Sequence, residues 1–115
     1  MAHTVTLLAD HKGFTKPKVV GDEYVVDAYI VVTTATSGGE VITATSLGLD
    51  SITCATITGN SLPATYDVDI EVSATGAYES NSSIALLFTA MDGTNAAADG
   101  DITDTTVRVR VWGNL

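Results

Sequence analysis

The stretch that decides the fold is Tyr66-Asp67-Val68-Asp69-Ile70-Glu71-Val72-Ser73-Ala74. Every second residue from Tyr66 is apolar, and the residues between are acidic or polar. Successive side chains of an extended strand point to opposite faces, so this period of two predicts a strand with one dry and one wet face. Thr106 to Trp112 repeats the pattern, with valines opposed to Arg108 and Arg110. Such strands predict sheets that pack over a shared core.

Other segments rich in β-branched and apolar residues also predict strands, because they end at glycine, proline or acidic turns. These segments are 4–9, 24–34, 51–58, 84–90 and 105–112, with a short strand at 41–42. Ser37 to Glu40 is expected to be a tight turn, since it holds two adjacent glycines. Thr43 to Leu49 is expected to form one helical turn, capped by Thr43 and ended by Gly48.

About seven to eight short strands in 115 residues favour one all-β domain over residues 1–115. An antiparallel β-sandwich or jelly roll fits this pattern, and a small barrel is the main alternative. Residues 1–9 are expected to be either an N-terminal arm or an edge strand of that domain.

Composition narrows the classes of partner. The chain has 14 acidic and 5 basic residues, a net charge of −9 and a mean hydropathy of +0.27. So few basic residues argue against binding to nucleic acid, which relies on Lys and Arg to release counterions. The longest apolar stretch, Tyr24 to Val32, is too short to span a bilayer. The first residues lack the pattern of a secretory signal, so we expect synthesis in a cytoplasm and no membrane association.

Three groups of residues could carry chemistry, and each has a plainer interpretation. The acidic stripe of Asp67, Asp69 and Glu71 could be catalytic or bind a metal, but an outer-face ladder of opposite charges with Arg108 and Arg110 is favoured. A loop with glycines and acids is a weak calcium candidate, because its ligand spacing does not follow the EF-hand pattern. The residues of that weak metal candidate are Asp99, Asp101 and Asp104.

The remaining candidate residues are histidine, cysteine and apolar side chains. His3 and His11 have neither the spacing nor the partners of a zinc site or a triad. Cys54 lies in an apolar-rich strand segment and is expected to be a buried, structural thiol. The apolar run 84–88 predicts a strand that is covered on both sides or lies in an interface. The candidate interface residues are Val5, Leu7, Leu86, Phe88 and Trp112.

One segment carries a resemblance to a known class of protein. The segment Gly38-Gly39-Glu40-Val41-Ile42-Thr43-Ala44-Thr45-Ser46-Leu47-Gly48-Leu49 resembles small virion structural proteins of tailed bacteriophages. In those proteins an analogous stretch follows a long early strand, as the strand containing Val25-Val26-Asp27-Ala28 does here, and precedes another strand. The resemblance implies a β-sandwich that is bound in many copies to a capsid as a decoration or minor head protein, with no catalytic residues.

These observations lead to a functional expectation. We expect a non-enzymatic decoration or cement protein without a cofactor, made in the host cytoplasm and located on the capsid surface of the virion. Its expected partners are the major capsid protein and further copies of itself, with two- or three-fold symmetry on the capsid. One alternative is a module of the tail, neck or fibre that recognises a receptor or a carbohydrate. A small hydrolase or metal-dependent enzyme built on the acidic residues is the third alternative.

Overall fold

The computed structural model describes residues 3–9, 12–20, 23–35, 39–72, 81–91 and 100–115. The described chain forms eight strands and a single 3-10 turn, η1. The strands are β1 (His3–Leu7), β2 (Lys18–Val20), β3 (Glu23–Ala35), β4 (Glu40–Thr43), β5 (Ser51–Asn60), β6 (Tyr66–Glu71), β7 (Ser83–Ala90) and β8 (Gly100–Asn114). None of the helical segments in this part of the chain is long and apolar enough to cross a membrane.

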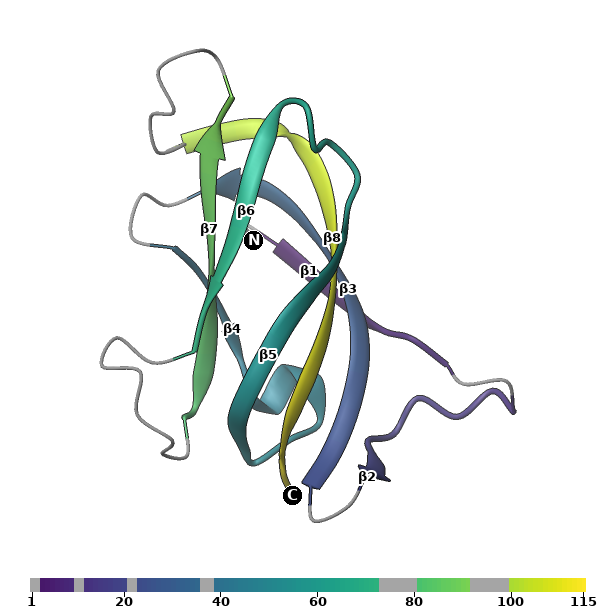
Figure 1. Ribbon diagram of the computed structural model, residues 1–115. Coiled ribbons are helices and arrows are strands. Elements are labelled where there is room, and N and C mark those ends of the chain that lie inside the picture. The colour runs from purple at the N-terminus through teal and green to yellow at the C-terminus, as the bar shows by residue number, and fades with distance from the viewer. Residues whose placement is uncertain (1–2, 10–11, 21–22, 36–38, 73–80, 92–99) are drawn as a thin grey trace.

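The strands form two antiparallel sheets that pack face to face (Figure 1). The five-stranded sheet has the order β1-β3-β8-β5, and β2 pairs with the first residues of β3. The three-stranded sheet has the order β4-β7-β6. This arrangement is a single-domain β-sandwich, which confirms the fold class predicted from the alternating segments.

The core consists of the inward residues of both sheets. Alternate residues of β3 and β8 are buried, and β4, β6 and β7 supply the opposite layer. The largest fully buried aliphatic side chains are Ile30, Val32, Ile42, Leu47, Ile52, Ile84, Leu86, Val107, Val109 and Val111. The ring of Tyr66 meets that of Phe88 edge to face, with centroids 6.0 Å apart. Small aliphatic side chains therefore fill most of this core, as the low aromatic content requires.

The turn after β4 forms where the sequence predicts it and ends at Gly48, but Ala44 rather than Thr43 occupies the N-cap position. In the helical turn η1 (Thr45–Leu47), the Ser46 amide donates a hydrogen bond to Thr43 Oγ1, at 3.3 Å. Gly48 ends the turn with φ of +79°, in the left-handed region where glycine has no steric penalty. Leu47 is thereby directed into the core.

The two sides of the sandwich are closed differently. On one side residues 61–65 connect β5 to β6. The Ser61 amide donates to the carbonyl oxygen of Thr106 in β8, and the Ser61 hydroxyl oxygen accepts from the Thr106 amide. On the other side β1 and β4 are the edge strands of their sheets, and a side-chain hydrogen bond between His3 and Glu40 joins them. Within the predicted segment 1–9, residues His3–Leu7 form an edge strand, and Met1 and Ala2 lie outside the described residues.

Candidate functional site

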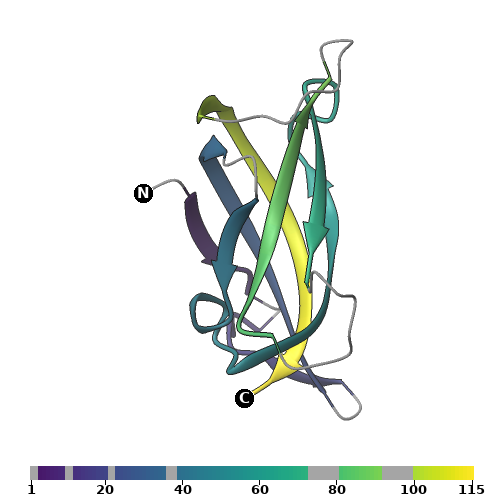
Figure 2. The ribbon, with the colours of Figure 1, turned by 90° about the vertical axis from the view of Figure 1, so that its left-hand side faces the viewer.

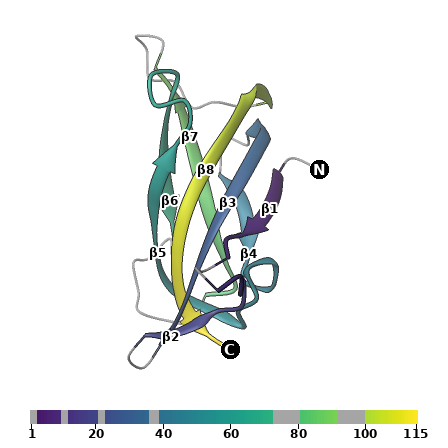
Figure 3. The same ribbon diagram turned by 90° about the vertical axis from the view of Figure 1, so that its right-hand side faces the viewer.

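The outer side of the five-stranded sheet carries both arginines of the chain. Its outward residues come mainly from β3 and β8, the two central strands, and Figure 3 shows this side toward the viewer. We call this surface the arginine face, and its main residues are Val25, Asp27, Tyr29, Val31, Arg108, Arg110 and Trp112. Tyrosine, tryptophan and arginine are the residue types most often found to dominate protein–protein binding energy.

Asp27 and Arg110 form a two-pronged ion pair across β3 and β8. Arg110 donates from Nε to Asp27 Oδ1 at 2.8 Å and from Nη2 to Oδ2 at 2.9 Å. These hydrogen bonds are the main reason that the pKa of Asp27 lies below its usual range. The charges of Arg110, Arg108 and Lys18 act in the same direction, and partial burial acts against them. Arg108 lies opposite Tyr29 and has no carboxylate partner in the described chain.

Replacing Asp27 by asparagine is expected to make the free energy of unfolding fall less steeply as the pH is lowered. The folded-state pKa of Asp27 is lowered, so its stabilisation is fully present above the unfolded-state pKa of about 3.9 and is lost as the pH falls through the folded-state pKa. The pair is partly exposed, so the loss at neutral pH should be below about 1 kcal/mol. Urea denaturation of the wild type and the Asp27→Asn variant from pH 7 to pH 2 measures the free energy of unfolding at each pH. Asp69→Asn is the control, and an equal effect of that variant would contradict the assignment.

The outer side of the three-stranded sheet has the opposite charge. Asp67, Asp69 and Glu71 all point outward from β6, and all are exposed. Their cross-strand neighbours on β7 are the uncharged Thr89, Leu87 and Ala85, in that order. We call this surface, together with the outward Val41 of β4, the acidic face; Figure 2 shows it toward the viewer.

The expected ladder of opposite charges does not form within the molecule. The acids of β6 and the arginines of β8 belong to different sheets and point outward from opposite layers of the sandwich. Arg110 is paired instead with Asp27, which comes from β3. Strand patterns reveal which residues share a face of one strand, but they do not reveal which strands share a sheet.

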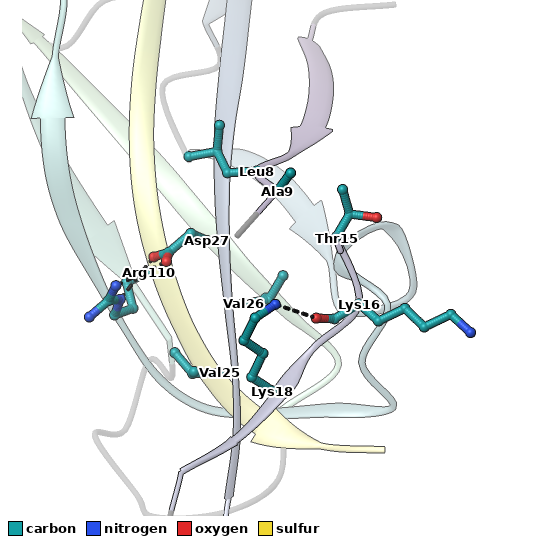
Figure 4. Close-up of a pocket in the computed structure, with 9 residues that line it drawn as sticks. All are labelled: Leu8, Ala9, Thr15, Lys16, Lys18, Val25, Val26, Asp27 and Arg110. Carbon is teal, nitrogen blue, oxygen red and sulfur yellow. Dashed lines mark hydrogen bonds and ion pairs between the residues drawn. The ribbon is translucent and has the colours of Figure 1, made fainter. Parts of the chain in front are cut away.

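A cavity of about 270 Å³ lies beside the arginine face, under the segment that leads into β2 (Figure 4). Lys18 donates from Nζ to the carbonyl oxygens of Phe14 at 3.3 Å and Lys16 at 3.5 Å, so its ammonium group holds this segment in place. The Lys16 side chain points away from the cavity. Among the described residues, the lining includes Asp27 and Arg110, which bind each other, and holds no histidine, cysteine or second carboxylate. The cavity therefore has the character of a packing gap beside the loop rather than that of an active site.

His3 and Glu40 form a contact that sequence reasoning missed. The distance between His3 Nδ1 and Glu40 Oε1 is 2.5 Å. Glu40 points inward from β4 and is buried, which is rare for a carboxylate without a partner. The inward position of Glu40, two residues before the buried Ile42, was the signal in the sequence.

The acidic loop is only partly described by the structure. Asp101 and Asp104 are exposed on the first part of β8, and Asp101 accepts a 3.4 Å bond from the Thr34 hydroxyl. Asp99 lies outside the described residues. Within the described ranges, no three His, Cys, Asp or Glu side chains are grouped so that they could hold a metal ion.

The five candidate interface residues lie in three different places. Leu86 and Phe88 belong to the core, with 0% and 3% of their surfaces exposed, so neither is available to a partner of the folded monomer. The run 84–88 is apolar throughout because β7 is the central strand of its sheet. Val5 and Leu7 face inward from β1 and are partly buried against the core. Trp112 lies half-buried on the arginine face.

Cys54 is exposed, contrary to the buried position expected for it. The register of β5 shifts between Ile52 and Cys54, and this irregularity turns Cys54 to the outer side beside Trp112. Desolvation, followed by the charge of Glu23, raises the pKa of the Cys54 thiol. A raised pKa leaves less of the nucleophilic thiolate, so the structure gives no support for a reactive cysteine.

An apolar end of the sandwich was also missed by sequence reasoning. Phe14 and Val19 are 62% and 66% exposed, and Leu115 is 62% exposed. The ribbon brings β2 and the C-terminal end of the chain to the same end of the sandwich in Figures 1 and 3. The carbonyl oxygen of Phe14 accepts a hydrogen bond from Lys18 Nζ, so the Phe14 backbone lies near β2. We call these three residues the apolar end; their signal in the sequence was the presence of large apolar residues within and next to the lysine-bearing segment 12–18.

The comparisons with known proteins add no relative to this picture. No family model matches the chain, and no curated protein or solved structure matches it either.

Proposed function

We propose that this chain is a non-enzymatic structural protein of a tailed-phage virion, most specifically a capsid decoration protein that binds the major capsid protein in many copies. The resemblance of residues 38–49 to small phage virion proteins suggests the virion. In the structure that segment contributes β4 and η1, which belong to the sandwich scaffold.

The observation that carries the proposal is the apolar end. Phe14, Val19 of β2 and Leu115 are exposed there, and the first two lie within or next to the lysine-bearing segment 12–18. Exposed apolar side chains that form a patch on a folded domain often mark a site of protein contact. A decoration protein attached by this end would stand on the shell and leave its two broad faces toward its neighbours.

Purified particles of the phage that encodes the chain provide the first test. Quantitative mass spectrometry should find the protein in mature virions at a copy number comparable with that of the major capsid protein. Absence from mature virions would contradict the proposal. Recovery from the tail fraction alone would also contradict it and would favour a tail-associated binding module.

Two variants at exposed apolar residues test the role of the apolar end. Val19→Asp should weaken binding to shells that lack the protein by about tenfold or more, because it places a charge in a contact that loses its water on binding. Met91→Asp is the control, since Met91 is also a large exposed apolar residue, 50% exposed, but follows β7 and belongs neither to the apolar end nor to either broad face. Thermal denaturation of both variants checks that they are folded. Equal binding of the two variants would exclude the apolar end as the shell contact.

A further inference from the structure

The two broad faces of this molecule carry complementary charges that cannot meet within it. Arg108 and Arg110 are exposed on the arginine face, and Asp67, Asp69 and Glu71 are exposed on the acidic face. The two sheets lie between these groups, since each set points outward from its own layer (Figures 2 and 3). None of the three acids has an ion-pair partner among the described residues.

The spacing of the charges also matches. Arg108 and Arg110 are two residues apart on β8, and so are successive acids on β6. Alternate residues of a strand are separated by about 7 Å, so a row of outward bases on one strand has the same repeat as a row of outward acids on another. Each face also carries exposed or partly exposed apolar side chains next to its charges. Tyr29 and Trp112 lie beside the arginines, and Leu87 and Val41 lie on the acidic face.

We infer that the occupant of the arginine face is the acidic face of a second copy of this chain. The copies stack front to back, with Arg108 of one copy against the carboxylates of β6 in the next. Arg110 contributes less, because Asp27 already occupies its Nε and Nη2 groups. This contact does not depend on the proposed role in a virion, since purified protein alone is sufficient to form it.

Salt should control the contact in an unusual way. Each copy has a net charge of −9, so copies repel each other at low ionic strength. The molecule is 23 Å across its shortest axis, whereas the Debye length is about 8 Å at 0.15 M salt. Physiological salt therefore screens the repulsion between whole molecules more strongly than it screens contacts between adjacent charges. Association should rise between about 0.01 M and 0.15 M salt and fall again towards about 1 M.

The contact joins two different surfaces, so it is heterologous. A heterologous contact does not end at two copies, because each added copy presents a new free face. The assembly should therefore grow with concentration into stacks or close into a ring of three or more copies. This differs from the two-fold arrangement, which is one of the two symmetries expected from the sequence.

Sedimentation velocity of the purified chain up to millimolar concentration tests the inference. Arg108→Glu and Asp69→Lys should each lower the association constant by about tenfold or more at 0.15 M salt, because each juxtaposes like charges. Lys16→Glu and Asp50→Lys are the controls for net charge; they make the same charge changes at exposed positions outside the strands that form the two faces. Thermal denaturation confirms that all four variants are folded.

The decisive measurement is a mixture of the two face variants. The reversed arginine face of Arg108→Glu fits the reversed acidic face of Asp69→Lys, so an equimolar mixture should regain association that neither variant shows alone. The inference is overturned by a monomer at every salt concentration, by controls that act as strongly as the face variants, or by a mixture that stays dissociated. Association that stops at a dimer overturns it as well.

Discussion

Replacing Gly113 by alanine is expected to cost about 3 kcal/mol of folding stability or more, and to lower the melting temperature by more than roughly 10 °C. Gly113 lies on β8 between Tyr24 of β3 and Ile52 of β5. A Cβ atom at this position would lie 2.0 Å from the carbonyl oxygen of Ser51. The obstacle is backbone, which cannot turn aside as a side chain can, so β5 would have to move away from β8.

Gly59→Ala is the matched control for this variant. Gly59 also lies where β5 pairs with β8, but a Cβ atom there would meet only the Arg108 Cβ, at 3.4 Å. This variant should change stability by less than about 1 kcal/mol. Calorimetry of the two variants provides the comparison. If Gly113→Ala has the same melting temperature as the wild type, the close approach of Ser51 to β8 is not a feature of the folded protein.

Truncating Leu86 to alanine is expected to cost about 2–5 kcal/mol, whereas the same change at the adjacent Leu87 should cost much less. Leu86 is fully buried between the sheets, so its truncation leaves a cavity. Leu87 points outward from the same strand, opposite Asp69. Urea denaturation gives the free energy of unfolding of each variant. The opposite order would mean that β7 is shifted by one residue, because such a shift exchanges the two faces of a strand.

Sequence reasoning predicted the parts of this fold that depend on local pattern. The alternation in 66–71 and 106–112 corresponds to the burial of β6 and β8, residue by residue. The helical turn also ends at Gly48, as predicted. In each case the strand period or the backbone preference of single residues contains the required information.

The remaining features depend on contacts between segments that lie far apart in the sequence. The sequence does not reveal that β6 and β8 are in different sheets, so the charge ladder could not be excluded before the structure was known. The exposure of Cys54 depends on a shift of register against β8. The apolar run in β7 concealed an alternation, since its outward residues Ala85 and Leu87 are apolar as well.

The position of β8 has a consequence for the order in which the protein folds during synthesis. β8 is the last of the eight described strands, yet it lies between β3 and β5 and pairs with β3 along most of its length and with β5 along residues 107–114. Before the ribosome has added residues 100–114, β3 and β5 have no shared partner, and half of the core remains open to water. All three strands of the smaller sheet have been synthesised once Ala90 is added. Its apolar face is then still uncovered, because the opposite layer lacks β8. We therefore expect the nascent chain to gain resistance to proteases in one late step, rather than gradually as each strand emerges.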